Sequence, residues 1–161
     1  MSFVSPKTAL ISLSDKSNLE ELVNFLISEN VKILSTGGTY SQIKNITNDV
    51  IEVSEFTGFE EMMDGRVKTL HPKIHAGILA RRDSDMEILK EKNYEQIDLV
   101  VVNLYPFQET VASECSFEEA IEKIDIGGPT MIRAAAKNFK DVVVVSNPND
   151  YKELIKEWKD N

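Results

Sequence analysis

The sequence predicts an α/β fold: a single domain whose mainly parallel β-sheet carries helices on both faces. Short apolar runs rich in Val, Ile and Leu alternate along the chain with amphipathic segments of helical period. That alternation is typical of parallel strands buried on both sides. The chain has 161 residues and neither a Gly/Ser-rich linker nor an internal repeat, which fits one domain with one sheet.

The first third of the chain predicts three strands and two helices. The strands are expected at residues 8–13, 31–35 and 49–53, and the helices at 19–30 and 39–46. In the first helix the apolar residues share one face: Leu19, Leu22, Val23, Leu26 and Ile27. Two pairs match a capping box, in which each side chain satisfies a free backbone N–H at the start of a helix. These pairs are Ser17 with Glu20 and Thr39 with Gln42.

The rest of the chain continues the alternation. Helices are predicted at 84–96, 116–124, 127–138 and 150–158, and buried strands at 98–107 and 141–146. Ser116 and Glu119 form a third capping box, and Asn147 with Pro148 is expected to begin the closing helix. Pro129 is expected at the first helical position of 127–138, and Phe107 in the core.

Composition excludes several classes of function. The formal net charge of −9 argues against a nucleic-acid partner, which normally requires a broad basic face. No apolar run approaches the ~20 residues that span a bilayer, and the N-terminus lacks a signal-peptide core, so no membrane partner is expected. The single cysteine, Cys115, excludes an internal disulfide and suits a reducing compartment. We therefore expect a cytoplasmic protein.

Residues 65–82 gather cations in this acidic chain. The stretch has no carboxylate and contains both histidines, His71 and His75, with five basic residues: Arg66, Lys68, Lys73, Arg81 and Arg82. One local cationic patch predicts a small anionic ligand, while Arg81 and Arg82 are expected at the surface or in a subunit contact. The two histidines lack a third metal ligand at suitable spacing, so we expect no metal site and structural roles for both.

Polar residues follow the first two strands, where a parallel sheet places its ligands. The first strand leads into Ser12, Ser14 and Lys16, and the second leads into the turn Ser35, Thr36, Gly37, Gly38 and Thr39. Glycine backbone N–H groups, hydroxyls and the start of a helix together favour a phosphate. The turn matches neither the dinucleotide nor the Walker pattern, so an ordinary strand-to-helix turn stays an alternative.

Two later segments carry similar groups. Asn103 and Tyr105 follow the fourth strand, and Asp125 precedes two glycines and a helix. Arg133 and Lys137 are four residues apart and share a helical face. A solvated face is the default for such a pair, but the alanines between them favour a closely packed helix with the cations directed inward.

Five motifs carry a resemblance to a known family, in this order: "SLSDKS", "STGGT", "MMDGRVKTLHPKIHAGIL", "NLYPF" and "DIGGPTMIRAAAKN". From about Lys7 to Tyr151 the chain closely resembles the inosine monophosphate cyclohydrolases. The family usually has glycine at the positions of Asn18 and Ala76. The resemblance implies a methylglyoxal-synthase-like fold, a homodimer, no cofactor, and closure of the purine ring of a ribotide. The family's fused formyltransferase domain is absent from residues 1–161, so we expect either a segment of a longer bifunctional protein or a stand-alone cyclohydrolase.

The resemblance also assigns residues. It implies that the 5′-phosphate and ribose are held by Ser12, Ser14, Lys16, Ser35, Thr36, Gly37, Gly38 and Thr39. It implies that the base and the reacting groups are surrounded by Arg66, Lys68, Thr69, Asn103, Tyr105, Asp125, Gly127, Gly128 and Lys137. Of these, the catalytic set is Lys68 as donor to the developing oxyanion with Tyr105 beside it, Asp125 on the carboxamide N–H, and Lys137 in proton transfer and water loss.

Two alternatives share the fold. One is a methylglyoxal-synthase-type lyase acting on a triose phosphate, which would leave "RVKTLHPKIH" unexplained. The other is a regulatory nucleotide-binding domain like the one that ends carbamoyl phosphate synthetase. Such a domain can dispense with the four catalytic residues, all of which this chain has.

Overall fold

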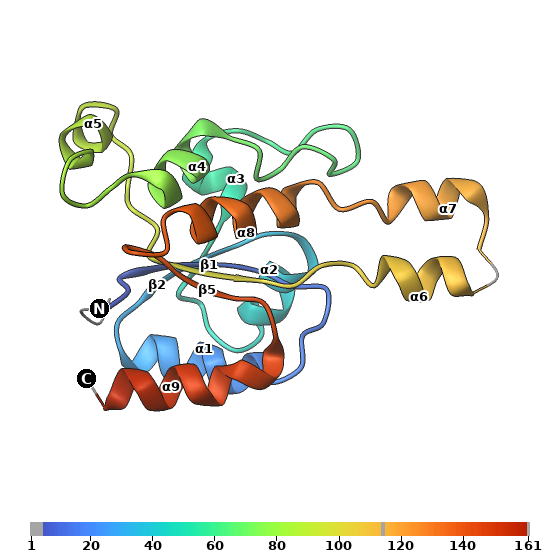
Figure 1. Ribbon diagram of the computed structural model, residues 1–161, viewed down its shortest axis with the longest axis horizontal. Helices are drawn as coiled ribbons and strands as arrows, with labels where there is room; N and C mark the ends of the chain where they lie inside the picture. Colours follow the sequence, from blue (N-terminus) through green and yellow to red (C-terminus); the bar gives the residue numbers. More distant parts are fainter. Residues whose placement is uncertain (1–4, 114, 161) are drawn as a thin grey trace.

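Five parallel strands form one sheet in the order β3-β2-β1-β4-β5, as seen in a computed structural model that describes residues 5–113 and 115–160 (Figure 1). The strands are β1 (Thr8–Ser12), β2 (Lys32–Ser35), β3 (Val50–Glu52), β4 (Leu99–Val102) and β5 (Val143–Val145). All four pairings are parallel, which confirms the predicted sheet. Chain order reverses between β1 and β4, so a ligand crevice is expected at their carboxyl ends.

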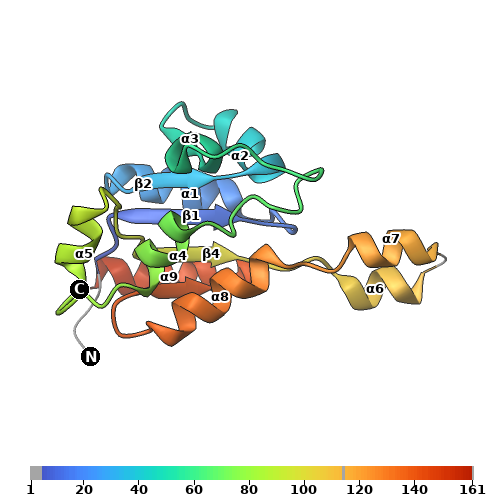
Figure 2. The ribbon, with the colours of Figure 1, turned by 90° about the horizontal axis from the view of Figure 1, so that it is seen from above.

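Helices cover both faces, and each face has its own core (Figures 1 and 2). One core holds α1 (Leu19–Ser28), α2 (Gly37–Lys44) and α9 (Tyr151–Lys159) against the sheet. The other holds α3 (Val53–Thr57), α4 (Pro72–Leu79) and α8 (Gly127–Lys137). The apolar face predicted for α1 is confirmed: four of its residues are buried and Ile27 packs against them. Within the described residues, no helix is long and apolar enough to cross a membrane.

The predicted helix starts were partly right. Ser116 and Glu119 form both bonds of a capping box at α7 (Phe117–Glu122), and Asn147 caps a short 3-10 turn, η1 (Pro148–Asp150), before α9. The box at Ser17 was wrong, because α1 is preceded by Asn18 in the left-handed conformation, with φ 59°. The left-handed conformation suits glycine or asparagine.

The starts of two more helices, α2 and α8, differ from the prediction. The hydroxyl of Thr39 bonds both backbone groups of Leu13, so it does not cap α2, which starts two residues earlier. Helix α8 begins at Gly127 rather than Pro129, because Asp125 accepts the backbone N–H of Gly128.

Several boundaries were also wrong. α5 (Met86–Glu91) and β4 are shorter than predicted, and α3, α4 and α6 (Phe107–Ala112) were not predicted. Phe107 is 41% exposed rather than in the core. Helices α6 and α7 form a hairpin that projects from the body (Figure 2), and neither has a buried residue among those described. Apolar periodicity therefore could not distinguish this hairpin from a helix packed on the sheet.

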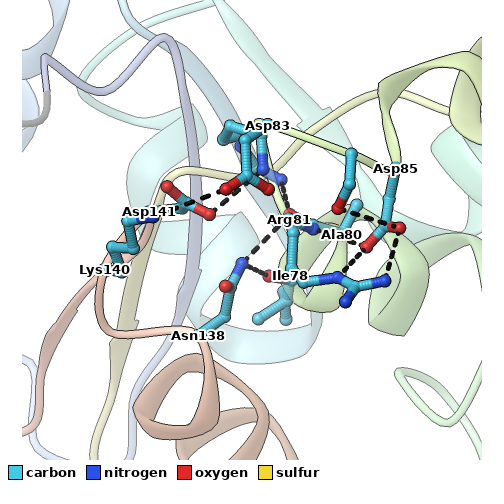
Figure 3. Close-up of polar contacts among 10 residues, drawn as sticks. Ile78, Ala80, Arg81, Asp83, Asp85, Asn138, Lys140 and Asp141 are labelled. Atoms are coloured by element: carbon cyan, nitrogen blue, oxygen red, sulfur yellow. Dashed lines mark hydrogen bonds and ion pairs between the residues drawn. The ribbon is translucent and has the colours of Figure 1, made fainter.

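Arg81 and Arg82 have different roles. Arg81 is exposed and forms a two-pronged ion pair with Asp85, as expected of a surface residue (Figure 3). The surface prediction for Arg82 was wrong: its guanidinium bonds Asp98 at 3.2 Å and three backbone carbonyls. Asp98 is 3% exposed and also accepts the N–H groups of Lys7 and Thr8. Asp98 thus joins the start of β4 to that of β1, and Arg82 joins the end of α4 to Asp98.

Candidate active site

A cavity of about 460 Å³ opens at the carboxyl ends of β1, β2 and β4, where chain order reverses. Fourteen of the residues assigned from the sequence line it: Ser12, Ser14, Thr36, Gly37, Gly38, Thr39, Arg66, Lys68, Thr69, Asn103, Tyr105, Asp125, Gly127 and Gly128. Segments far apart in the chain therefore meet in one place. Lys16, Ser35 and Lys137 do not line the cavity.

The first turn of α2 carries the features of an anion site. Gly37 has φ +57° and begins the helix after Thr36, whose side chain makes no capping bond. The Nζ atom of Lys68 lies 3.4 Å from the position that a Cβ on Gly37 would take. The Nζ atom of Lys16 lies 4.0 Å from the position that a Cβ on Gly38 would take. Two ammonium groups therefore flank backbone N–H groups that have no partner within the helix, a combination that favours a phosphate.

Not every hydroxyl of this region is available to a ligand. The side chain of Ser35 is fully buried and donates to the carbonyl of Ile11 at 2.8 Å, so the expected phosphate contact through its hydroxyl was wrong. Thr39 likewise uses its hydroxyl on Leu13 and can offer a ligand only its backbone. Ser12 and Ser14 both line the cavity. Buried hydroxyls are normally hydrogen-bonded, and those of Ser35 and Thr39 meet that need at the backbone of Ile11 and Leu13.

The loop of residues 58–71 supplies the two cations of the cavity, Arg66 and Lys68. Arg66 pairs with Glu122 of α7, and Lys68 pairs with Glu61 at 3.0 Å. Gly65, at φ +84°, leaves room for Lys68, because a Cβ there would lie 2.5 Å from Cε of that lysine. The other cations of the 65–82 stretch serve elsewhere; Lys73, for example, donates to the carbonyl of Phe56.

Asp125 and Tyr105 face the cavity from the two stems of the α6–α7 hairpin. One carboxylate oxygen of Asp125 accepts the backbone N–H of Gly128 at 2.8 Å, which fixes the carboxylate at the start of α8. Tyr105 is 47% exposed, and Nζ of Lys123 lies 5.0 Å from the centre of its ring. The site therefore combines a fixed hydrogen-bond acceptor with a phenol at its rim.

Lys137 lies at the other end of α8. Ten residues separate it from Gly127, which is roughly 15 Å along a helix. The next residue, Asn138, bonds the carbonyls of Ile78 and Ala80 at the end of α4 (Figure 3). Both Arg133 and Lys137 are exposed, so the expectation that they point inward was wrong. The inner face of α8 is instead made by small or flexible apolar residues: Met131, Ala134 and Ala135.

The histidines have structural positions. His71 precedes α4, and its Nδ1 accepts the backbone N–H of Lys73 at 3.0 Å. Burial lowers the pKa of His75, and a hydrogen bond to the backbone of Thr69 ties its ring to the residue that follows Lys68. Among the described residues, no group of three or more His, Cys, Asp or Glu side chains is placed to hold a metal ion.

Several lining residues were missed from the sequence. Asp64 and Gly65 stand inside a quoted motif but were given no role, and α7 contributes Ile121 and Glu122. Helix α7 gave the usual signal of an amphipathic helix, which does not reveal that its last turn reaches a cavity.

The fold and the cavity define the class: an α/β domain with a polar pocket, lined by both basic and acidic residues, at the carboxyl edge of a parallel sheet. The chain belongs to the MGS-like domain family, whose model matches residues 18–130. Relatives named bifunctional purine biosynthesis protein PurH are 60% identical over 153 residues in Fusobacterium nucleatum subsp. nucleatum and 57% identical over 157 in Clostridium beijerinckii. These matches cover 94% and 96% of this chain but only 30% and 31% of the relatives, so the chain spans less than a third of their length.

A solved structure supports the same fold. The crystal structure of ForH superimposes with a TM-score of 0.81 and 35% sequence identity, covering 97% of this chain and 81% of that one. The methylglyoxal-synthase-like fold expected from the motifs is therefore confirmed.

Proposed function

We propose that the chain is an inosine monophosphate cyclohydrolase, which closes the purine ring of 5-formamidoimidazole-4-carboxamide ribotide with loss of water. One observation carries the proposal: Lys68, Tyr105 and Asp125 line the same cavity as the phosphate-type turn Thr36–Thr39. The names of the PurH relatives, which refer to purine biosynthesis, support the same assignment.

In the proposed reaction the carboxamide nitrogen attacks the formyl carbon of the same molecule. A C–N bond forms and the formyl oxygen becomes an oxyanion. That oxygen takes up one proton from the carboxamide nitrogen and one from the formamido nitrogen, and it leaves as water when the C–O bond breaks and a C=N bond forms. Holding the two groups in contact supplies much of the rate, because the reaction is intramolecular. The phosphate binds at the first turn of α2 between Lys16 and Lys68, which places the base toward Tyr105 and Asp125.

The three cavity residues divide the chemistry. Lys68, with Tyr105 beside it, donates hydrogen bonds to the oxyanion. The oxygen of Asp125 that does not hold Gly128 accepts the carboxamide N–H and so raises the nucleophilicity of the nitrogen. Lys137 does not reach the cavity of its own chain, so within one chain the proton transfers fall to Lys68, Tyr105 and Asp125.

Incubation with the formylated ribotide tests the proposal. Appearance of the purine ultraviolet spectrum is expected, and neither the triose-phosphate lyase nor the regulatory domain predicts it. Lys68→Ala and Asp125→Ala should each lower turnover by at least about a hundred-fold, whereas Lys73→Ala, outside the cavity, should not. The proposal fails if the wild-type chain produces no purine chromophore, and the assigned roles fail if Lys68→Ala or Asp125→Ala retains near-normal turnover.

A further inference from the structure

Each of the two cations that line the cavity among the described residues is paired with a glutamate: Lys68 with Glu61, and Arg66 with Glu122. We propose that Glu61 and Glu122 set the affinity of the cavity for anions, by competing with a bound anionic ligand for Lys68 and Arg66. The inference rests on the proposed function only in requiring that the cavity binds an anion.

Lys68 lies between two competing partners. Its Nζ is 3.0 Å from Oε2 of Glu61 and faces the start of α2, where an anion would sit. Glu52, Glu60 and Glu61 are among the residues that line a second, smaller hollow of about 340 Å³, and Lys68 lines both this hollow and the cavity. An anion at α2 therefore draws the ammonium group toward the main cavity, and Glu61 draws it toward the acidic hollow.

Arg66 is likewise paired with a glutamate, Glu122, which comes from helix α7. Glu122, in the last turn of α7, binds the guanidinium, and both side chains are more than half exposed, at 59% and 60%. Exposed ion pairs are weak, so a ligand anion can displace the carboxylate. Glu122 itself lines the cavity, together with Asp64 and Asp125. Its charge therefore also repels an incoming phosphate.

Removing either carboxylate charge tests the inference. Inosine 5′-monophosphate and inorganic phosphate are titrated by calorimetry into the whole chain and into Glu61→Gln and Glu122→Gln, at low and high salt. Each variant is expected to bind at least one of these anions about three-fold or more tightly than wild type at low salt, with a smaller difference at high salt. Glu55→Gln on α3 and Glu118→Gln on α7 remove the same charge from exposed positions outside the cavity, and both should bind as wild type does.

Unchanged or weaker binding of both anions by Glu61→Gln and Glu122→Gln overturns the inference, because the glutamates would then position the cations or be inert. The cyclisation assay keeps the two proposals apart. If the variants bind anions more tightly but the wild-type chain shows no turnover, only the proposed function is contradicted. If the wild-type chain turns over but the variants bind anions as it does, only the inference is contradicted.

Discussion

The side chain of Asn103, just after β4, accepts the backbone N–H of Ser14, just after β1, at 2.7 Å. The same oxygen accepts the N–H of Asp15 at 2.9 Å, and the amide nitrogen donates to the carbonyl of Asp15 at 2.7 Å. Asn103 was expected among the residues that surround the base and the reacting groups, and it lines the cavity. Its three bonds also hold the turn after β1, so its side chain shapes the part of the cavity beside Ser14.

Asn103→Ala should therefore impair substrate binding more than chemistry. Losing three hydrogen bonds that shape the turn is expected to raise KM about ten-fold and to lower the free energy of unfolding by about 1–3 kcal/mol. Steady-state kinetics and urea unfolding measure the two effects, with exposed Asn48→Ala as control. A normal KM in Asn103→Ala would show that the turn keeps its shape without the side chain.

Gly65→Ala should displace Lys68. A Cβ at residue 65 would lie 2.5 Å from Cε and 2.9 Å from Nζ of Lys68, so the ammonium group must move. We expect turnover to fall by about ten-fold or more, because a small displacement of a reacting group is costly. Gly58→Ala is a matched control: its φ of +72° imposes similar backbone strain, but its Cβ would meet no atom within 4 Å. Equal turnover in the two variants would contradict the role of Lys68.

Arg82→Ala should destabilise the fold without touching the cavity. The substitution leaves the buried carboxylate of Asp98 without its cationic partner, which typically costs about 3–5 kcal/mol. Urea unfolding measures the loss, and Arg81→Ala, which removes only a surface pair, should unfold almost as wild type does. Similar midpoints for the two variants would refute the structural role of Arg82.

Stability should also fall at high pH because of Tyr151, which is buried at the start of α9. Burial, with a smaller effect of the charge of Asp15, raises the pKa of Tyr151 from 10.0 to about 12. The fold favours the protonated phenol, so this contribution is complete below the unfolded pKa and is lost as pH rises from about 10 toward about 12. Two pKa units correspond to about 2–3 kcal/mol.

The comparison of wild type with Tyr151→Phe isolates that contribution, since phenylalanine cannot ionise. Urea unfolding between pH 9 and the alkaline limit of the native state should show a steeper loss of stability in the wild type. Parallel pH profiles for the two proteins would be inconsistent with a raised pKa of Tyr151.

Strand and helix patterns predicted the parallel sheet well because burial on both faces leaves an unmistakable run of apolar residues, as in Leu99–Val102. Local capping signals were less reliable. Thr39 has the right residue type for a cap, but its hydroxyl satisfies backbone groups of Leu13, which are distant in sequence. Tertiary contacts of this kind override the local preference of a residue, and they leave no repeating pattern in the sequence.

The cavity was largely predicted because the carboxyl ends of parallel strands meet at one edge, which brings Ser12, Thr36 and Asn103 together. Lys137 was a different case. A sequence motif does not show which end of a helix lies at a pocket. Helix α8 starts at the cavity and leads away from it toward the end of α4, so Lys137 in its last turn lies outside the cavity. The contribution of Glu122 could not be predicted either, because the helix expected at 116–124 gives no sign that its last turn reaches the cavity.

A crystal structure of the chain with inosine 5′-monophosphate tests the central claim most directly. We predict the phosphate at the first turn of α2 between Lys16 and Lys68, and the base between Tyr105 and Asp125. A nucleotide bound outside this cavity, or one whose phosphate lies at Asp125, would contradict it.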